Sequence, residues 1–221
     1  SQATLMNVGG TEAVTTFPDA FSLQSYGSVQ NKLMSIILPQ GIETLADNCF
    51  NKNKSLASVT LPEGLKKIGA SAFYQTALTS IDLPESLEEI GEYAFRSITE
   101  LESVIIPESV TAVGEYCFER SGLRNVVWNS SCDIATNVFP YIETLETVTL
   151  NKCGTIAKGA FRRSTIQEMI VNIDTPPMFT IDTEPVNKPV INKIYVPAAS
   201  VETYKATPDW SEYADVTSAI Q

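Results

Sequence analysis

Histidine is absent from the 221 residues, and basic side chains are scarce. Without histidine the chain has no Ser-His-Asp or Cys-His catalytic system and no histidine-ligated metal site. Lysine and arginine number 15 against 26 aspartates and glutamates, so the formal net charge is −11. An acidic chain repels phosphate, and we expect neither nucleic acid nor an anionic membrane surface as a partner. No apolar run approaches the roughly 18–20 residues of a membrane span, so we expect no transmembrane segment.

Cysteine is also rare, and the N-terminus lacks the features of a signal segment. The four cysteines form no CxxC motif and no metal-ligand cluster. The first residues include no initiator methionine, basic region or apolar stretch, so we interpret the chain as one whose signal segment has been removed. Together with abundant Ser, Thr and Asn, this predicts an extracellular or cell-surface protein.

A repeat of about 22–23 residues dominates the sequence. The repeated phenylalanines are Phe50, Phe73, Phe95, Phe118, Phe139 and Phe161. One unit contains Leu-x-Ser-Val-x-Leu-Pro followed by Glu-Gly-Leu-x-x-Ile-Gly-x-x-Ala-Phe, and units of this kind run from Leu33 to Val171. A fixed period of this length predicts a solenoid, in which each unit forms one coil, here called a rung, and shares its core with its neighbours.

The two halves of a rung have different patterns. In the first half apolar and polar residues alternate, as in a strand, and a proline ends the strand because it has no N–H. The predicted inward pairs are Ile36/Leu38, Val59/Leu61, Ile81/Leu83, Val104/Ile106, Val126/Trp128, Val148/Leu150 and Met169/Val171. In the second half, Leu65, Ile68 and Phe73 recur at helical spacing, but Gly69 interrupts them. We therefore predict a turn and then a single helical turn at Ala-Phe.

The consensus resembles the leucine-rich repeat of BspA-like bacterial surface proteins, also called the Treponema-type repeat. Units 33–50, 56–73, 78–95 and 101–118 carry it, whereas 123–139 and 145–161 have Asn129 and Asn151 in place of proline. The resemblance implies an α/β, β-rich solenoid, a right-handed superhelix with a parallel sheet on one face and turns or short helices on the other. It also implies that the sheet is the ligand-facing surface.

We predict one domain with irregular ends. Residues 1–32 form an N-terminal cap, in which Asp19-Ala20-Phe21 echoes the repeat and 5–8 is its strand. The solenoid spans 33–173, and 174–221 hold a Pro-rich connection without regular structure, a last strand at 194–196 and a C-terminal cap. Ser200 caps a helix over 201–205, and Tyr204, Trp210 and Tyr213 cover the end of the core. This last segment is similar to the closing segment of secreted Bacteroides-type repeat proteins.

The repeat places the cysteines relative to one another. Cys49 and Cys117 are three rungs apart, about 14 Å, which is too far for a disulfide. Cys132 and Cys153 occupy the same position of the repeat on adjacent rungs. Their spacing permits a disulfide, and two buried thiols are the alternative.

The same register predicts which side chains face outward from the sheet. One outward position forms the sheet-face row, which consists of Ile37, Thr60, Asp82, Ile105, Val127, Thr149 and Ile170. Ile105 and Val127 are adjacent apolar residues that face away from the core, and exposed apolar patches often mark binding surfaces. The alternative is that β-branched residues simply suit strands.

Acidic side chains offer two further possibilities. Glu63, Glu85 and Glu108 recur on successive rungs and could hold Ca²⁺, or they form a solvated rim. Glycoside hydrolysis needs two carboxylates across one cleft, but Asp82 and Glu168 lie several strands apart. We therefore expect no catalytic residues, no metal and no cofactor.

The sequence favours a non-enzymatic extracellular binding or adhesion module. Its ligand would be a host or microbial protein or glycan, held on the sheet-face row. One alternative is a structural spacer that displays another domain, and a carbohydrate-active enzyme is a further one.

Overall fold

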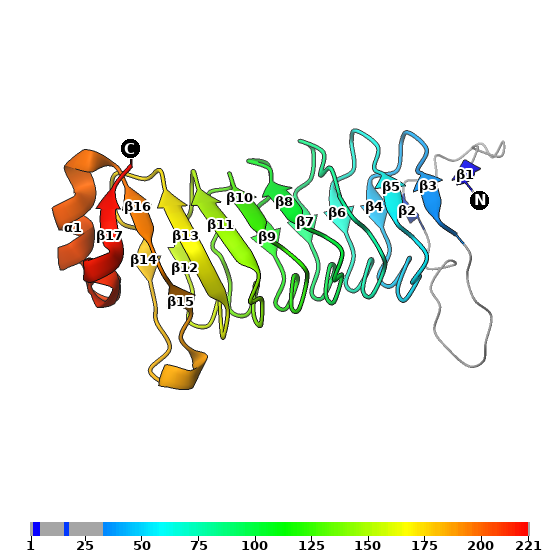
Figure 1. Ribbon diagram of the computed structural model, residues 1–221. Helices are drawn as coiled ribbons and strands as arrows, with labels where there is room; N and C mark the ends of the chain where they lie inside the picture. The colour runs from blue at the N-terminus through cyan, green and yellow to red at the C-terminus, as the bar shows by residue number, and fades with distance from the viewer. Residues whose placement is uncertain (1, 5–15, 18–32, 221) are drawn as a thin grey trace.

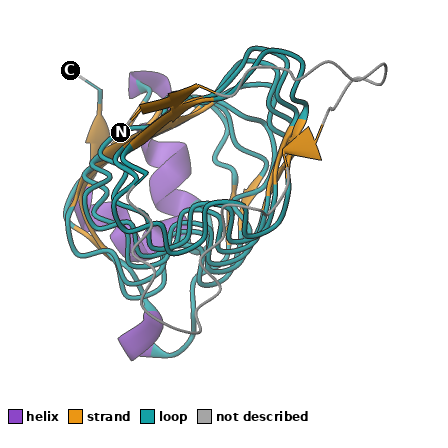
Figure 2. Cartoon of the chain, turned by 90° about the vertical axis from the view of Figure 1, so that its right-hand side faces the viewer, coloured by secondary structure: helices purple, strands orange, loops and turns teal. Residues whose placement is uncertain are grey.

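The computed structural model describes residues 2–4, 16–17 and 33–220, and rungs follow one another along a single axis (Figure 1). Seen along that axis, successive rungs superimpose, and strands occupy two separate sides of the coil (Figure 2). Within the described residues, helices occur only at the C-terminal end of the chain, from 185 onward. The chain is therefore a β-rich solenoid with mostly parallel strands, as the repeat predicts.

The alternating half of each rung forms the first strand position. A three-stranded parallel sheet contains β1 (Gln2–Thr4), β3 (Ser35–Ile37) and β5 (Ser58–Thr60). A seven-stranded sheet contains β8 (Ser103–Ile106), β10 (Asn125–Trp128), β11 (Leu145–Leu150), β13 (Thr165–Val171), β15 (Val190–Ile191), β16 (Ile194–Val196) and β17 (Thr217–Ala219). Equivalent residues pair in register, so each inward side chain lies next to the side chain at the equivalent position of the next rung.

The rung between these two sheets departs from the prediction. The strand expected at Ile81 and Leu83 is wrong, because residues 79–83 form no strand and interrupt the ladder. The side chains still alternate, with Ile81 buried and Asp82 exposed. Aspartate is depleted from strands, so Asp82 disfavours a strand at this position.

A second strand position, which the sequence did not predict, lies in the Leu-x-x-Ile segment. Its five-stranded sheet contains β2 (Thr16–Phe17), β4 (Thr44–Leu45), β6 (Lys67–Ile68), β7 (Glu89–Ile90) and β9 (Ala112–Val113). Further along, β12 (Thr155–Ile156) pairs with β14 (Met178–Phe179). The Pro-rich segment predicted to lack regular structure thus contributes β14, β15 and the 3₁₀ helix η2 (Pro185–Asn187).

The corner that holds each Ala-Phe pair is a turn, and the predicted single helical turn does not form. On every rung the residues two before and two after the phenylalanine have positive φ, as at Ser71 (55°) and Gln75 (55°). Residues in this left-handed region cannot continue a right-handed helix. Their N–H groups instead donate to the next rung, as from Ser71 to the Glu92 carbonyl at 2.8 Å.

The glycine after each Leu-x-x-Ile segment allows two rungs to approach closely. A Cβ on Gly91 would lie 2.6 Å from the Ala70 nitrogen, and one on Gly114 would lie 2.4 Å from the Glu92 nitrogen. These distances are shorter than van der Waals contact with backbone atoms. The Gly of the repeat is therefore a packing requirement.

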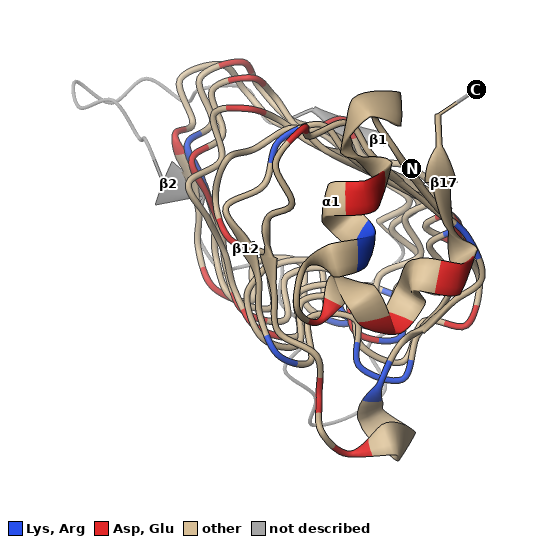
Figure 3. Cartoon of the chain, turned by 90° about the vertical axis from the view of Figure 1, so that its left-hand side faces the viewer, with Lys and Arg blue, Asp and Glu red and all other residues tan. Residues whose placement is uncertain are grey.

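The C-terminal end of the core is covered by α1 (Val201–Ala206) and the 3₁₀ helix η4 (Trp210–Val216), with η3 (Ala198–Ser200) before α1 (Figure 3). Tyr204 and Trp210 are fully buried, and the Trp210 indole N–H donates to the Pro177 carbonyl at 2.8 Å. The Tyr213 hydroxyl donates to the Pro189 carbonyl at 3.0 Å. The side chain of Ser200 makes no capping hydrogen bond to α1.

At the N-terminal end, β1 pairs with β3 and β2 pairs with β4. The chain before the first regular rung therefore supplies one strand at the first strand position and one at the second. The predicted strand at 5–8 and the Asp19-Ala20-Phe21 motif lie outside the described residues.

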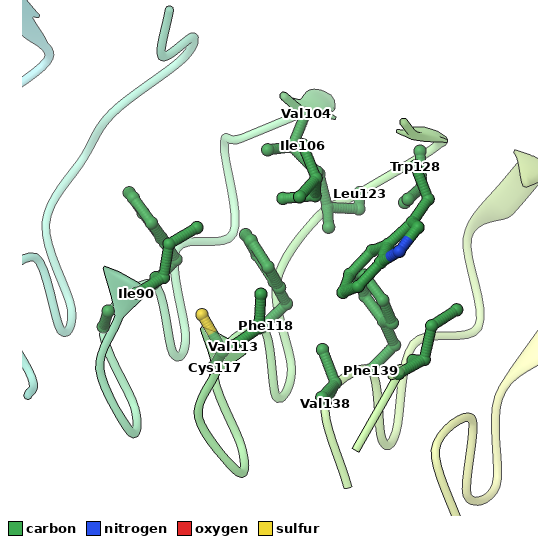
Figure 4. Close-up of a cluster of buried hydrophobic side chains, with 14 of the residues drawn as sticks. Ile90, Val104, Ile106, Val113, Cys117, Phe118, Leu123, Trp128, Val138 and Phe139 are labelled. Atoms are coloured by element: carbon green, nitrogen blue, oxygen red, sulfur yellow. The ribbon is translucent and has the colours of Figure 1, made fainter. Parts of the chain in front are cut away.

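A continuous stack of aromatic rings runs through the core. Phe50, Phe73, Phe95, Phe118, Phe139 and Phe161 stack with centroids 5.1–5.4 Å apart. Trp128 meets Phe139 edge-on at 6.1 Å (Figure 4). Each of these rings is buried, and full burial of such a side chain is worth about 1.5–3 kcal/mol.

Candidate binding surface on the sheet face

The sheet-face row is continuous over the seven-stranded sheet. Register pairs join Ile105 to Val127, Val127 to Thr149, and Thr149 to Ile170. The next partner of Ile170 is Tyr195 on β16. The sequence predicted the strand of Tyr195 but did not assign Tyr195 to the row, because the intervening Pro-rich segment breaks the repeat period.

The other predicted members lie apart from this run. Ile37 and Thr60 are paired with each other in the three-stranded sheet. Asp82 lies between the two sheets, on the rung whose first strand position forms no strand. The structure therefore brings Ile105, Val127, Thr149 and Ile170 together on one sheet, and it separates Ile37, Thr60 and Asp82 from them.

Exposure is uneven along the row. Ile105 is 58% exposed and Ile37 is 38% exposed, whereas Val127, Thr149 and Ile170 are half-buried. A half-buried side chain on a flat sheet still presents its outer methyl groups to a ligand. The strip from Ile105 to Ile170 is thus mainly apolar, with Tyr195 at its C-terminal end.

Polar side chains border the strip on both sides. On the N-terminal side of the strands, the Thr147 hydroxyl donates to Asn125 Oδ1 at 2.7 Å. On the other side, Asn151 Nδ2 donates to Asn129 Oδ1 at 2.8 Å, and Asn172 Nδ2 donates to Asn151 Oδ1 at 2.6 Å. These cross-rung bonds fix the amides in one orientation and leave part of their hydrogen-bonding capacity for a ligand.

Charges gather at the edges of the strip. Lys193 Nζ lies 3.2 Å from Glu168 Oε1. The hydrogen bond with Glu168, followed by the attraction of Tyr195, raises the pKa of Lys193, so this side chain is cationic at neutral pH. Arg124 bridges two rungs through Glu146 (2.8 Å) and Glu102 (4.0 Å).

The two cysteines on adjacent rungs are free thiols. The Gly154 N–H donates to the Cys132 carbonyl at 3.3 Å, which places Cys153 beside Cys132 across the rungs. Burial raises the pKa of the Cys153 thiol to about 12 and also raises the pKa of Cys132. Both groups are therefore protonated at neutral pH.

The acidic residues considered for chemistry remain separate. Asp82 and the strand of Glu168 are four rungs apart, about 19 Å, which is far beyond the roughly 5–9.5 Å between paired glycosidase carboxylates. Glu108 forms an ion pair with Lys152. Among the described residues, no three His, Cys, Asp or Glu side chains are grouped as metal ligands.

The stacked coils, the in-register parallel strands and the recurring Leu, Pro, Gly and Phe positions define a leucine-rich-repeat solenoid. The profile of the BspA type leucine rich repeat region matches residues 22–146 and 66–176, with six copies. The chain belongs to this family. No curated protein matches the chain.

The chain is similar to solved structures of leucine-rich-repeat proteins. A leucine rich repeat protein of T. pallidum has a TM-score of 0.51 and 20% identity, over 76% of this chain and 73% of that chain. A leucine-rich repeat protein from Bacteroides ovatus has a TM-score of 0.42 and 15% identity, over 82% and 63%. A leucine rich cell surface protein from Faecalibacterium prausnitzii has a TM-score of 0.32 and 17% identity, over 100% and 87%. In the described part of the chain, no helix combines the length and apolar character needed to cross a membrane.

Proposed function

We propose that this chain is a non-enzymatic, extracellular binding module that holds a host or microbial protein on its sheet face. The supporting observation is the in-register strip of Ile105, Val127, Thr149 and Ile170, in which Ile105 is exposed and the others are half-buried. Hydrogen-bonded amides border this strip. An apolar centre with a hydrogen-bonding rim is the usual anatomy of a protein interface. Membership of the BspA-type family supports the same role, since its resemblance to bacterial surface proteins implies display outside the cell.

The test is a binding screen of the purified protein against immobilised matrix proteins and host and microbial glycans at physiological salt. The variant Ile105→Asp/Val127→Asp places two charges at the centre of the strip. Buried charges without partners are costly, so we expect its affinity for any protein ligand to fall by at least about tenfold. Circular dichroism and thermal melting check that the stack stays folded.

A matched control carries the same two charges elsewhere. Met178 and Val186 are 68% and 64% exposed, and neither lies on the strands of the sheet-face row. The variant Met178→Asp/Val186→Asp should bind like the wild type. Equal binding by both double variants would contradict the sheet-face site, and the absence of any ligand would favour a structural spacer.

A further inference from the structure

A second line of side chains runs along the turn corner, away from the sheet-face row. We define the turn row as the residues two positions after each core phenylalanine: Lys52, Gln75, Ser97, Arg120, Tyr141 and Arg163. All six have φ between 53° and 60°. Each donates its N–H to the next rung, as from Arg120 to the Pro140 carbonyl at 3.2 Å. Identical backbone geometry on stacked rungs places these side chains in one line, about 4.8 Å apart.

The first part of the turn row lines a polar depression. Its volume is about 310 Å³, and its lining includes Lys54, Gln75, Thr76, Ser97, Thr99 and Glu100. Six of the seven lining residues carry hydroxyl, amide or charged groups, and the seventh is Ala77. Such a lining suits a ligand rich in hydroxyl groups better than an apolar one.

The second part of the turn row carries two ordered guanidinium groups. Arg120 Cζ lies 5.4 Å and Arg163 Cζ lies 5.8 Å from the centroid of the Tyr141 ring. Arg120 comes from the rung before Tyr141 and Arg163 from the rung after, so they flank opposite faces of the ring. The cation–π contacts hold both groups in place while the Arg120 side chain stays 63% exposed.

The local charge of the row opposes that of the whole molecule. The turn row has three basic residues and no acidic one, in a chain with a net charge of −11. Glu119, the neighbour of Arg120, is buried, and its carboxylate lies 2.8 Å from Arg96 Nε. Arg120 Nε lies 3.8 Å from the other Glu119 oxygen, and Arg163 Nε donates to Asn187 Oδ1 at 3.3 Å. Both side chains are exposed, so their remaining N–H groups can meet an anionic ligand.

We propose that the turn row binds an acidic polysaccharide. Sugar hydroxyl groups would occupy the depression at Gln75 and Ser97, and carboxylate or sulfate groups would meet Arg120 and Arg163. Guanidinium forms paired, charge-assisted hydrogen bonds with such oxyanions. The row from Gln75 to Arg163 covers four rung steps, about 19 Å, which is room for several sugar units.

The geometry favours a polysaccharide over a nucleic acid. Nucleic-acid binding draws on many phosphate contacts with Lys and Arg, whereas the turn row offers only Lys52, Arg120 and Arg163. Single strands also need open aromatic faces for base stacking. Both faces of Tyr141 are covered by arginine, so the row offers no such platform there.

Isothermal titration calorimetry tests the proposal with four probes. A heparin-derived octasaccharide and an oligogalacturonate octamer supply sulfate and carboxylate, maltooctaose is the neutral sugar, and a twelve-residue oligothymidylate is the polyphosphate. We expect at least one acidic octamer to bind, more tightly than maltooctaose or oligothymidylate. The Arg120→Gln/Arg163→Gln variant should raise its Kd at least about tenfold, because charge-assisted hydrogen bonds are lost. Thr99→Trp, which fills the depression, should also weaken binding of that acidic octamer.

The matched control removes two positive charges from other faces. Arg124→Gln/Lys152→Gln breaks ion pairs with Glu146 and Glu108 and should leave Kd within about twofold, because exposed pairs contribute little. The proposal is overturned by no binding of either acidic octamer, by preference for oligothymidylate or maltooctaose, or by equal losses in the control. Ile105→Asp/Val127→Asp should leave this affinity unchanged, so the two sites fail independently.

Discussion

At the corners of this solenoid, single residues adopt an unfavourable backbone conformation. Two positions on each of six rungs adopt left-handed φ values, and Gly159 (76°) is the only glycine among these positions. The others include bulky residues such as Tyr93 (58°) and Tyr116 (57°). A left-handed L-residue costs roughly 1–2 kcal/mol, and hydrogen bonds to the next rung offset that cost.

Gly159 gives a direct measure of this backbone cost. A side chain there has space, since the nearest atom to an added Cβ is Asn137 Oδ1 at 3.4 Å. A β-branched residue should nevertheless lower the free energy of unfolding by roughly 1–2 kcal/mol, about 2–8 °C in Tm, for conformational reasons alone. We therefore expect Gly159→Val to melt earlier by calorimetry.

Asparagine tolerates the left-handed region, and Asn137 occupies the equivalent position one rung earlier. Gly159→Asn is thus the control and should stay close to the wild type. Equal losses in both variants would show that space, and not backbone conformation, limits this position.

At the scale of elements, the sequence predicts a strand where the alternation of apolar and polar residues is long enough to recognise. The first strand position has five alternating residues and a proline stop, and its strands form as predicted except at the Asp82 rung. The second strand position is only two residues long, as in β6 and β7, so no alternation could reveal it. The left-handed corner residues share no residue type, and only the stacked backbone shows why the predicted helical turn fails.

Two tyrosines make the C-terminal cap sensitive to alkaline pH. Burial raises the pKa of Tyr213 to about 12 and raises that of Tyr204 as well. In the unfolded chain a tyrosine ionises near pH 10, so the unfolded state loses protons first. The contribution of these groups is intact below about pH 10 and is lost as the pH rises towards 12.

We expect the free energy of urea unfolding to fall between pH 10 and 12, and to fall less steeply in Tyr213→Phe. Tyr213→Phe also loses the hydrogen bond to Pro189, so the pH slope is the informative readout and the absolute stability is not. Ser211→Ala changes an exposed, non-titrating cap residue and should keep the wild-type slope. An unchanged slope in Tyr213→Phe would exclude this tyrosine as a source of alkaline instability.

At the scale of the whole molecule, stacking converts a short repeat into one continuous core and two continuous surfaces. The period alone predicts that Ile105, Val127, Thr149 and Ile170 share a row, because equal spacing gives equal register. It does not predict Tyr195, which follows a long insertion. The Arg120–Tyr141–Arg163 contacts were also missed, since their spacing is periodic but their residue types differ.

Stability in such a stack should depend on position along the axis, because each rung contacts only its neighbours. Phe118 stacks on both Phe95 (5.3 Å) and Phe139 (5.1 Å), whereas Phe161 ends the phenylalanine row on Phe139 (5.3 Å). Both rings are buried. We expect Phe118→Ala to lower the free energy of unfolding by about 3–5 kcal/mol, and Phe161→Ala to cost less.

Urea titrations of both variants, followed by circular dichroism and by tryptophan fluorescence, show whether the rungs unfold together or in two steps. If Phe118 couples the rungs on its two sides, Phe118→Ala should split the two transitions, because both tryptophans lie on its C-terminal side. In Phe161→Ala the N-terminal rungs keep their stacked rings, and its transitions should stay closer together. Equal losses with superimposed transitions in both variants would mean that the core is stabilised as a whole and not rung by rung.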